Sequence, residues 1–143
     1  MTISKVTKVE DLDGIWSDIW TPIDTIESIK KLNQIELLRW ILKYAPCHGK
    51  FLEAGCGVGQ YVFYMKKLGF DIEGLDLSSG AIEKCKDFAE LHEIDTNIFK
   101  VGDIRSTDYE DNTFSYYLSF GVIEHFKEGP KEAIDEAFRI LEP

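Results

Sequence analysis

The chain has 143 residues, of which 44% are hydrophobic and 29% are charged, as in an ordinary globular domain. Its formal net charge of −10 argues against a protein that grips nucleic acid, because phosphate contacts need a basic surface. The three cysteines form no C-x-x-C pair, so the sequence predicts reduced thiols and a cytoplasmic protein without a disulfide framework or a metal site. Residues 1–14 have no continuous apolar core, so we expect neither a secretory signal nor a membrane span.

The first part of the chain predicts helices. Residues 11–29 carry isolated apolar residues among polar ones, which suggests short helical pieces. Residues 33–45 have apolar side chains at helical spacing and Pro46 ends the run, so one amphipathic helix is expected there. We therefore divide the chain into an N-terminal helical segment, residues 1–32, and a core domain, residues 33–143.

From residue 51 onward, expected strands alternate with expected helices. Ser78 or Ser79 is a suitable N-cap for the helix after the second strand, and the last helix is expected to bury Ile134 and Phe138. Such alternation indicates βαβ units with right-handed crossovers, so the fold class is α/β, a parallel sheet with helices on both faces. Ligands of such sheets bind at the carboxyl ends of the strands. Strands are predicted at residues 51–54, 70–77, 97–101 and 114–120, and the last helix at 130–141.

The segment from Gly55 to Gly59 is a glycine turn directly after the first predicted strand, which carries Glu53 near its end. Glycines spaced G-x-G-x-G allow a sharp turn that a ligand can approach closely, and the N–H groups of the following helix, which Gly69 closes, point at that ligand. The dinucleotide fingerprint is G-x-G-x-x-G, so the G-x-G-x-G spacing with Glu53 before it disfavours a nicotinamide-dependent oxidoreductase. No lysine follows the glycines as in a P-loop. Glu53 would repel a phosphate but suits a ligand with an ammonium group and hydroxyls. A tight turn in some other α/β domain is the alternative interpretation.

The glycine turn resembles motif I of the S-adenosylmethionine-dependent methyltransferases with the Rossmann-like fold. The segment from Phe114 to Phe126 resembles the fourth-strand motif of the small-molecule members, and the whole resemblance covers residues from about 33 to 143. It implies a Rossmann-like sheet of strand order 3-2-1-4. It also implies an enzyme that uses S-adenosylmethionine, forms S-adenosylhomocysteine and transfers a methyl group to a small-molecule acceptor.

The sequence departs from this family at its end. In the family, the segment that corresponds to the residues before Pro143 continues into a fifth strand and further C-terminal strands. The present sequence lacks these strands. The fourth strand is then expected to be a sheet edge, which a second copy of the chain can cover in a homodimer. The alternative to an active enzyme is therefore a truncated, non-catalytic module that binds S-adenosylmethionine and self-associates through this edge.

The resemblance implies cofactor contacts at the ends of the strands. Asp76 is expected to accept hydrogen bonds from both ribose hydroxyls, and capping of the next helix is its alternative role. Leu77 is expected to pack on the adenine, and Asp103 and the main chain of Ile104 are expected to form hydrogen bonds with it. Phe120 and Gly121 are expected to lie along the methionine part of the cofactor. The full set of expected cofactor contacts is Glu53, Ala54, Gly55, Cys56, Gly57, Gly59, Asp76, Leu77, Asp103, Ile104, Phe120 and Gly121.

His125 is the candidate catalytic residue. It follows the fourth strand, where the acceptor is expected to arrive, and a histidine there can orient the acceptor or remove its proton. A local hydrogen-bonding role at the end of a turn is the alternative. Trp16, Trp20 and Tyr61 form a candidate lid around the sulfonium, whose positive charge favours aromatic faces, and plain packing is their alternative role. No residue indicates which acceptor atom is methylated.

Overall fold

The computed structural model of the chain describes residues 18–19, 23–32, 36–45 and 48–143. They form a four-stranded sheet of strand order β3-β2-β1-β4, in which every pairing is parallel. The α/β fold class and the strand order 3-2-1-4 predicted from the sequence are confirmed. The strands are β1 (Lys50–Ala54), β2 (Asp71–Asp76), β3 (Phe99–Val101) and β4 (Tyr116–Leu118).

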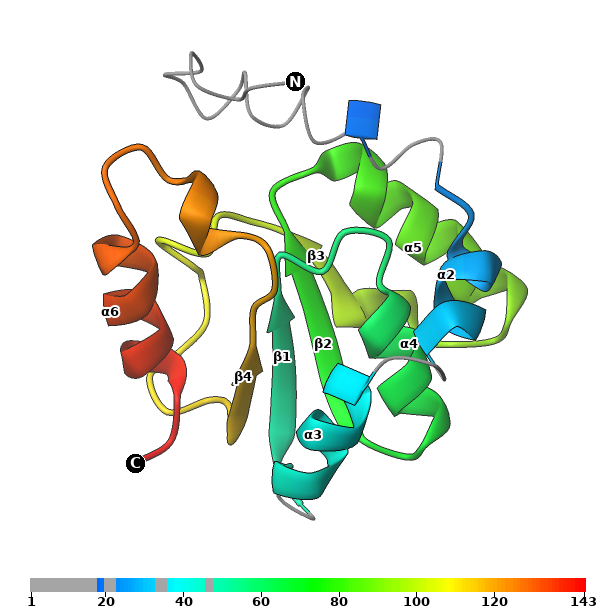
Figure 1. The fold of residues 1–143 in the computed structure, drawn as a ribbon, viewed down its shortest axis with the longest axis horizontal. Coiled ribbons are helices and arrows are strands. Elements are labelled where there is room, and N and C mark those ends of the chain that lie inside the picture. The colour runs from blue at the N-terminus through cyan, green and yellow to red at the C-terminus, as the bar shows by residue number, and fades with distance from the viewer. Residues whose placement is uncertain (1–17, 20–22, 33–35, 46–47) are drawn as a thin grey trace.

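Helices cover both faces of this sheet (Figure 1). Side chains alternate between the faces along each strand, so Phe51 and Leu52 of β1 belong to two different cores. Phe51 packs with the helices between β1 and β3, and Leu52 packs with the last helix. The helices are α2 (Thr25–Leu32), α3 (Glu36–Tyr44), α4 (Gln60–Lys67), α5 (Ser79–Leu91) and α6 (Lys131–Ile140), with short 3-10 turns η1 (Thr96–Ile98) and η2 (Ile123–His125).

The predicted helix ends are confirmed where they depend on local chemistry. Ser78 is the N-cap of α5, because its Oγ accepts a hydrogen bond from the Ala81 N–H at 3.1 Å. Gly69 follows the C-cap of α4 with a φ of 91°, and the Phe70 N–H donates to the Met65 carbonyl at 3.1 Å. This is the hydrogen-bond pattern of a Schellman motif.

The fourth strand is shorter than predicted. Only Tyr116–Leu118 pair with β1, because Leu118 lies opposite Glu53 and the chain turns away toward β2 at Gly55. Phe114 pairs instead with the end of the chain: its N–H donates to the Ile140 carbonyl at 2.9 Å, and its carbonyl accepts from the Glu142 N–H at 2.8 Å. This isolated bridge between residues 114 and 141 is parallel, so the edge beside β4 is partly covered by the chain itself.

The predicted buried face of α6 is wrong at two positions. Ala133 and Ile140 are buried against the sheet, whereas Ile134 is 42% and Phe138 is 78% exposed. Helical spacing identifies an apolar stripe but not its width, and α6 touches the sheet along one narrow row of small and branched residues. Among the described residues nothing covers the adjacent row, so Phe138 forms an exposed apolar patch.

Candidate functional site

The glycine turn after β1 has the conformation that its spacing predicts. Gly55, Gly57 and Gly59 have φ values of 83°, 52° and 71°. A Cβ on Gly55 would lie 2.3 Å from Val122 Cγ2, so a side chain there would meet the segment that follows β4. Glycine at this position therefore allows two strand ends to approach closely.

Two buried cysteines contact the main chain of the glycine turn. Cys85 of α5 donates from Sγ to the Gly57 carbonyl at 3.3 Å, and the Cys56 Sγ lies 3.8 Å from the same oxygen. Burial and the neighbouring Cys85 thiol raise the pKa of Cys56, so it is held as a neutral thiol. Both are free thiols that pack and donate weakly, as expected for buried cysteine.

Glu53 lies beneath the turn and not in the cavity above it. Its side chain is buried, and Oε2 accepts a hydrogen bond from the Val62 N–H at 3.2 Å. This bond satisfies an N–H in the first turn of α4, whose N-cap Gly59 has no side chain to do so. Burial raises the pKa of Glu53 well above its usual range, the Asp76 charge raises it further, and the Val62 N–H opposes both.

Asp76 connects the glycine turn to the start of α5. Oδ2 accepts from the Gly57 N–H at 2.7 Å, and Oδ1 accepts from the Ser78 N–H at 2.8 Å. The carboxylate is 6% exposed and forms part of the wall of a cavity. Asp76 therefore orders the start of α5, as the alternative role expected, and also faces the space where a ligand is expected.

A cavity lies at the carboxyl ends of the strands and encloses about 600 Å³ of empty space, including its open mouth. Carboxylates and apolar side chains together form its wall, which suits a ligand with hydroxyl and amino groups on a flat apolar body. The lining residues are Gly55, Asp76, Leu77, Asp103, Ile104, Phe120, Gly121, Val122, His125 and Phe126.

The structure brings together most of the expected contact residues, but not all of them. Seven of the twelve expected cofactor contacts and the candidate catalytic histidine line the cavity. Two lining residues, Val122 and Phe126, were missed, although both lie in the segment that carries His125. Their nearness to that histidine was the available signal. The five expected contacts outside the lining are Glu53, Ala54, Cys56, Gly57 and Gly59, which form the end of β1 and the body of the turn.

Asp103 is already paired within the chain. The Arg105 Nη2 and Nε donate to its two carboxylate oxygens at 2.5 to 3.1 Å, and the Arg105 main-chain N–H donates to Oδ1 at 2.9 Å. Burial raises the pKa of Asp103, but the bonds from Arg105 outweigh it and hold the pKa below its usual value. This pairing was not predicted from the sequence.

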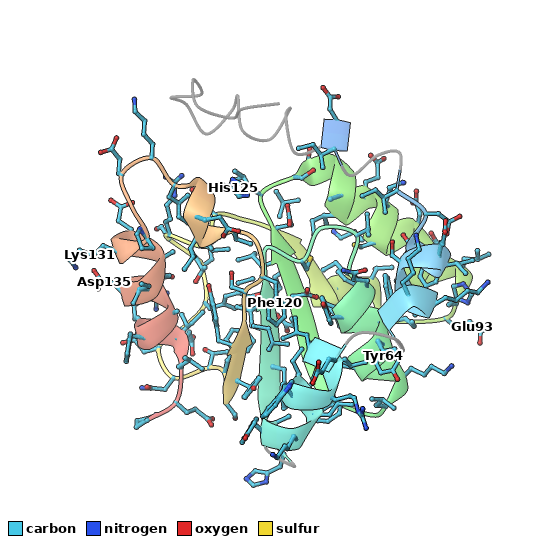
Figure 2. The ribbon with its side chains drawn as sticks, in the orientation of Figure 1. Tyr64, Glu93, Phe120, His125, Lys131 and Asp135 are labelled. Atoms are coloured by element: carbon cyan, nitrogen blue, oxygen red, sulfur yellow. The ribbon has the colours of Figure 1, made fainter. Side chains whose placement is uncertain are left out.

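His125 and Phe120 lie at the end of the sheet where the cavity opens (Figure 2). His125 is exposed in η2, and its main-chain N–H donates to the Val122 carbonyl at 3.1 Å. The Phe120 ring packs on Tyr61 with centroids 5.2 Å apart, so Tyr61 supports one wall of the cavity from α4. Trp16 and Trp20 lie outside the described residues, so their predicted lid role has no structural description.

The described residues contain neither a candidate metal site nor a candidate membrane-spanning helix. No group of three or more histidine, cysteine, aspartate or glutamate side chains in these parts of the chain could hold a metal ion. No helix within the same described ranges is long and apolar enough to cross a membrane.

Comparison with known proteins places these features in one family. Residues 52–143 match the family model described as a methyltransferase domain. A ubiquinone/menaquinone biosynthesis C-methyltransferase of Roseobacter denitrificans is 28% identical over 152 aligned positions, covering 99% of this chain and 59% of the relative. A ubiquinone biosynthesis O-methyltransferase of Paraburkholderia phymatum is 33% identical over 95 positions, covering 66% of this chain and 38% of the relative.

A solved structure has the same fold. The PH0226 protein of Pyrococcus horikoshii superimposes with a TM-score of 0.70 at 34% identity, covering 75% of this chain and 50% of that one. The chain thus spans 38% to 59% of the length of these relatives. The family model covers more than half of the chain and includes the glycine turn, Asp76, Asp103 and His125. The chain therefore belongs to the methyltransferase-domain family of S-adenosylmethionine-dependent methyltransferases with the Rossmann-like fold.

Proposed function

We propose that this chain binds S-adenosylmethionine in the cavity at the strand ends and transfers its methyl group to a small-molecule acceptor. The observation that carries the proposal is that one cavity is lined by Asp76 at the end of β2, Asp103 in the loop after β3 and His125 in the turn η2 after β4. The family match supports the same ligand. The chain covers only part of its relatives, so activity remains a proposal for this chain.

The residues present fit the proposed ligand. Asp76 is held at the cavity wall by two main-chain N–H groups, in a position to accept from ribose hydroxyls. Leu77 and Ile104 supply apolar contact for the adenine, and Asp103 supplies an acceptor for its amino group. Phe120 and Gly121 follow β4 and are proposed to lie along the methionine part. Gly55, at the start of the glycine turn, lies on the same cavity wall and adds main chain without a side chain there.

His125 is proposed to act at the mouth of the cavity. S-adenosylmethionine supplies a methyl group that its sulfonium already activates, so the chain has to position the acceptor, exclude water and remove a proton where the acceptor carries one. An exposed histidine on the cavity wall can orient an acceptor or take its proton. Phe126 and Val122 supply the apolar wall beside it.

The binding step is tested by calorimetric titration with S-adenosylhomocysteine. We expect Asp76→Asn to weaken binding by about 10- to 150-fold, since hydrogen bonds to a charged group contribute about 1.5–3 kcal/mol. Asp71→Asn, at the exposed amino end of the same strand, is the matched control and is expected to bind like the natural chain. Folded natural protein that binds no S-adenosylhomocysteine, or equal binding by Asp76→Asn, contradicts the proposal.

The acceptor is proposed only as a small molecule. The two curated relatives differ in the atom that their names say they methylate, carbon in one and oxygen in the other. Neither name decides whether carbon or oxygen is the acceptor atom for this chain. Formation of S-adenosylhomocysteine in the presence of a panel of phenols, amines, thiols and activated carbon acids identifies the acceptor class, and His125→Ala is expected to lower that rate without weakening cofactor binding.

A non-catalytic module that binds the cofactor and self-associates through the edge of β4 is the second candidate. It is favoured by the position of β4 at the edge of the described sheet. Light scattering over a concentration series measures the association, and the acceptor panel measures turnover. A dimer that binds S-adenosylhomocysteine but methylates nothing supports this candidate over the enzyme.

The cytoplasmic location also stays a prediction, supported by the absence of any C-x-x-C pair in the sequence.

A further inference from the structure

Arg105 contacts two walls of the cavity at once. Its Nε donates to Oδ1 and Oδ2 of Asp103 at 3.0 and 3.1 Å, and its Nη2 donates to Oδ2 at 2.5 Å. The same guanidinium lies over the Phe126 ring, with Cζ 4.9 Å from the ring centre. Asp103 follows β3 and Phe126 follows η2, so one side chain joins the loop after β3 to the turn that carries His125.

This pairing differs from an ordinary surface ion pair. The side chains of Asp103 and Arg105 are each 23% exposed, and Asp103 and Phe126 both line the cavity. An arginine can bind a carboxylate with two parallel N–H groups while its flat face stacks on a ring. A lysine offers a single ammonium and cannot do both. The arrangement therefore depends on the shape of the arginine and not only on its charge.

We propose that Arg105 is a positioning residue that fixes the Asp103 carboxylate in the orientation from which it recognises the 6-amino group of a bound purine. This inference rests on the proposed function. A 6-amino group donates a hydrogen bond to a carboxylate, whereas a 6-oxo group presents an acceptor and is repelled. Purine discrimination by Asp103 thus requires a carboxylate that is both oriented and ionised.

Arg105 supplies both conditions. Its fork fixes the plane of the carboxylate, and the tight turn is closed by the Ser106 N–H, which donates to the Asp103 carbonyl at 3.1 Å. Burial alone would raise the pKa of Asp103, and the bonds from Arg105 reverse the direction. Without the guanidinium, the carboxyl keeps its burial and loses the opposing charge. A neutral carboxyl can donate as well as accept, so it would distinguish the two purines poorly.

The test compares two ligands in each variant by calorimetry. They are S-adenosylhomocysteine and S-inosylhomocysteine, which differ in the 6-amino and 6-oxo groups and in N1, an acceptor in the first and an N–H donor in the second. We expect Arg105→Gln to lower the ratio of the two affinities by about tenfold, which corresponds to about 1.4 kcal/mol. Arg105→Lys should give an intermediate ratio, because it keeps the charge but loses the fork.

Arg139→Gln is the matched control. Arg139 pairs with Glu136 and Asp111 as Arg105 pairs with Asp103, but none of these three residues lines the cavity. Its loss should destabilise the chain and leave the ligand ratio unchanged. In an Asp103→Asn background, Arg105→Gln should have no further effect on the ratio, because the group that it positions is gone.

The outcomes separate this proposal from the proposed function. If the natural chain prefers S-adenosylhomocysteine and both Arg105 variants keep its ratio, the positioning role is overturned and the proposed function stands. Equal weakening of both ligands by Arg105→Gln also overturns it, since that is the effect of general structural loss. A natural chain that binds neither ligand overturns both proposals.

Discussion

Gly55→Ala is the substitution that most directly tests the geometry of the glycine turn. Gly55 has a φ of 83°, and a Cβ there would lie 2.3 Å from Val122 Cγ2. Gly69 has a φ of 91°, and a Cβ there would meet nothing within 4 Å. The two glycines have similar backbone conformations, so a comparison of their alanine variants separates backbone strain from collision with Val122.

The expected magnitudes follow from these two terms. A non-glycine residue in the left-handed region costs about 1–2 kcal/mol, which is the whole expected loss for Gly69→Ala. Forcing an extra methyl group into a packed site costs about 1–3 kcal/mol more, so Gly55→Ala should lose about 2–5 kcal/mol. Removing the methyl groups of Val122 in the same chain relieves the collision. Gly55→Ala with Val122→Ala should therefore be more stable than the sum of the two single losses predicts.

Urea unfolding followed by circular dichroism measures the natural chain, the three single variants and the double variant under one set of conditions. A coupling of about 1–3 kcal/mol between Gly55 and Val122 is expected from the collision term. Equal losses in Gly55→Ala and Gly69→Ala would falsify the claim that the turn packs against the segment after β4. Simple additivity of Gly55→Ala and Val122→Ala would also count against it.

Three further predictions concern buried or capping groups. Arg139 lowers the pKa of Glu136 to about 2, so Glu136 contributes stability that is present above its unfolded pKa of 4.5 and lost as the pH falls toward 2. In Glu136→Gln, the free energy of unfolding should therefore fall less steeply between pH 6 and pH 2 than in the natural chain. Parallel curves for the two proteins contradict this prediction. Burial raises the pKa of Glu53, so its contribution to stability is largest below pH 4.5 and declines as the pH rises through the higher folded pKa. The free energy of unfolding of Glu53→Gln, relative to that of the natural chain, should therefore rise with pH. A difference that stays constant with pH rules this out. Ser78→Ala should lose about 1 kcal/mol of stability by removal of the N-cap. An unchanged free energy of unfolding would show that the cap is unimportant.

Features with local causes could be predicted from the sequence. The glycine turn, the Ser78 cap and the Gly69 end of α4 each depend on a few neighbouring residues, and each was predicted where it occurs. Asp76 was also placed correctly at the carboxyl end of β2 and on the cavity wall. The order of the strands followed from the family resemblance, since spacing alone does not fix which strands are neighbours.

Features that depend on distant partners could not be predicted in the same way. The length of β4 is set by where β1 turns away, and the buried face of α6 is set by which element covers it. The role of Arg105 depends on a ring contact with Phe126, and no local pattern signals that contact. Glu53 is a partial exception, because alternation along β1 places it on the same face as Phe51, toward α4.

The parallel bridge at Phe114 limits how two copies of the chain could join. An isologous twofold pairing across a sheet edge brings the same strand of each copy together in opposite directions, whereas residues 140–142 run in the same direction as β4 and already use both main-chain groups of Phe114. What is left of the described β4 ladder is the three-residue stretch Tyr116–Leu118. A stable complex buries about 800 Å² on each partner, far more than so short a stretch supplies. A symmetric pair would therefore need side-chain contacts beyond the strand, and the exposed ring of Phe138 is an apolar surface available for them on α6, the helix whose Ala133 and Ile140 pack with Phe114.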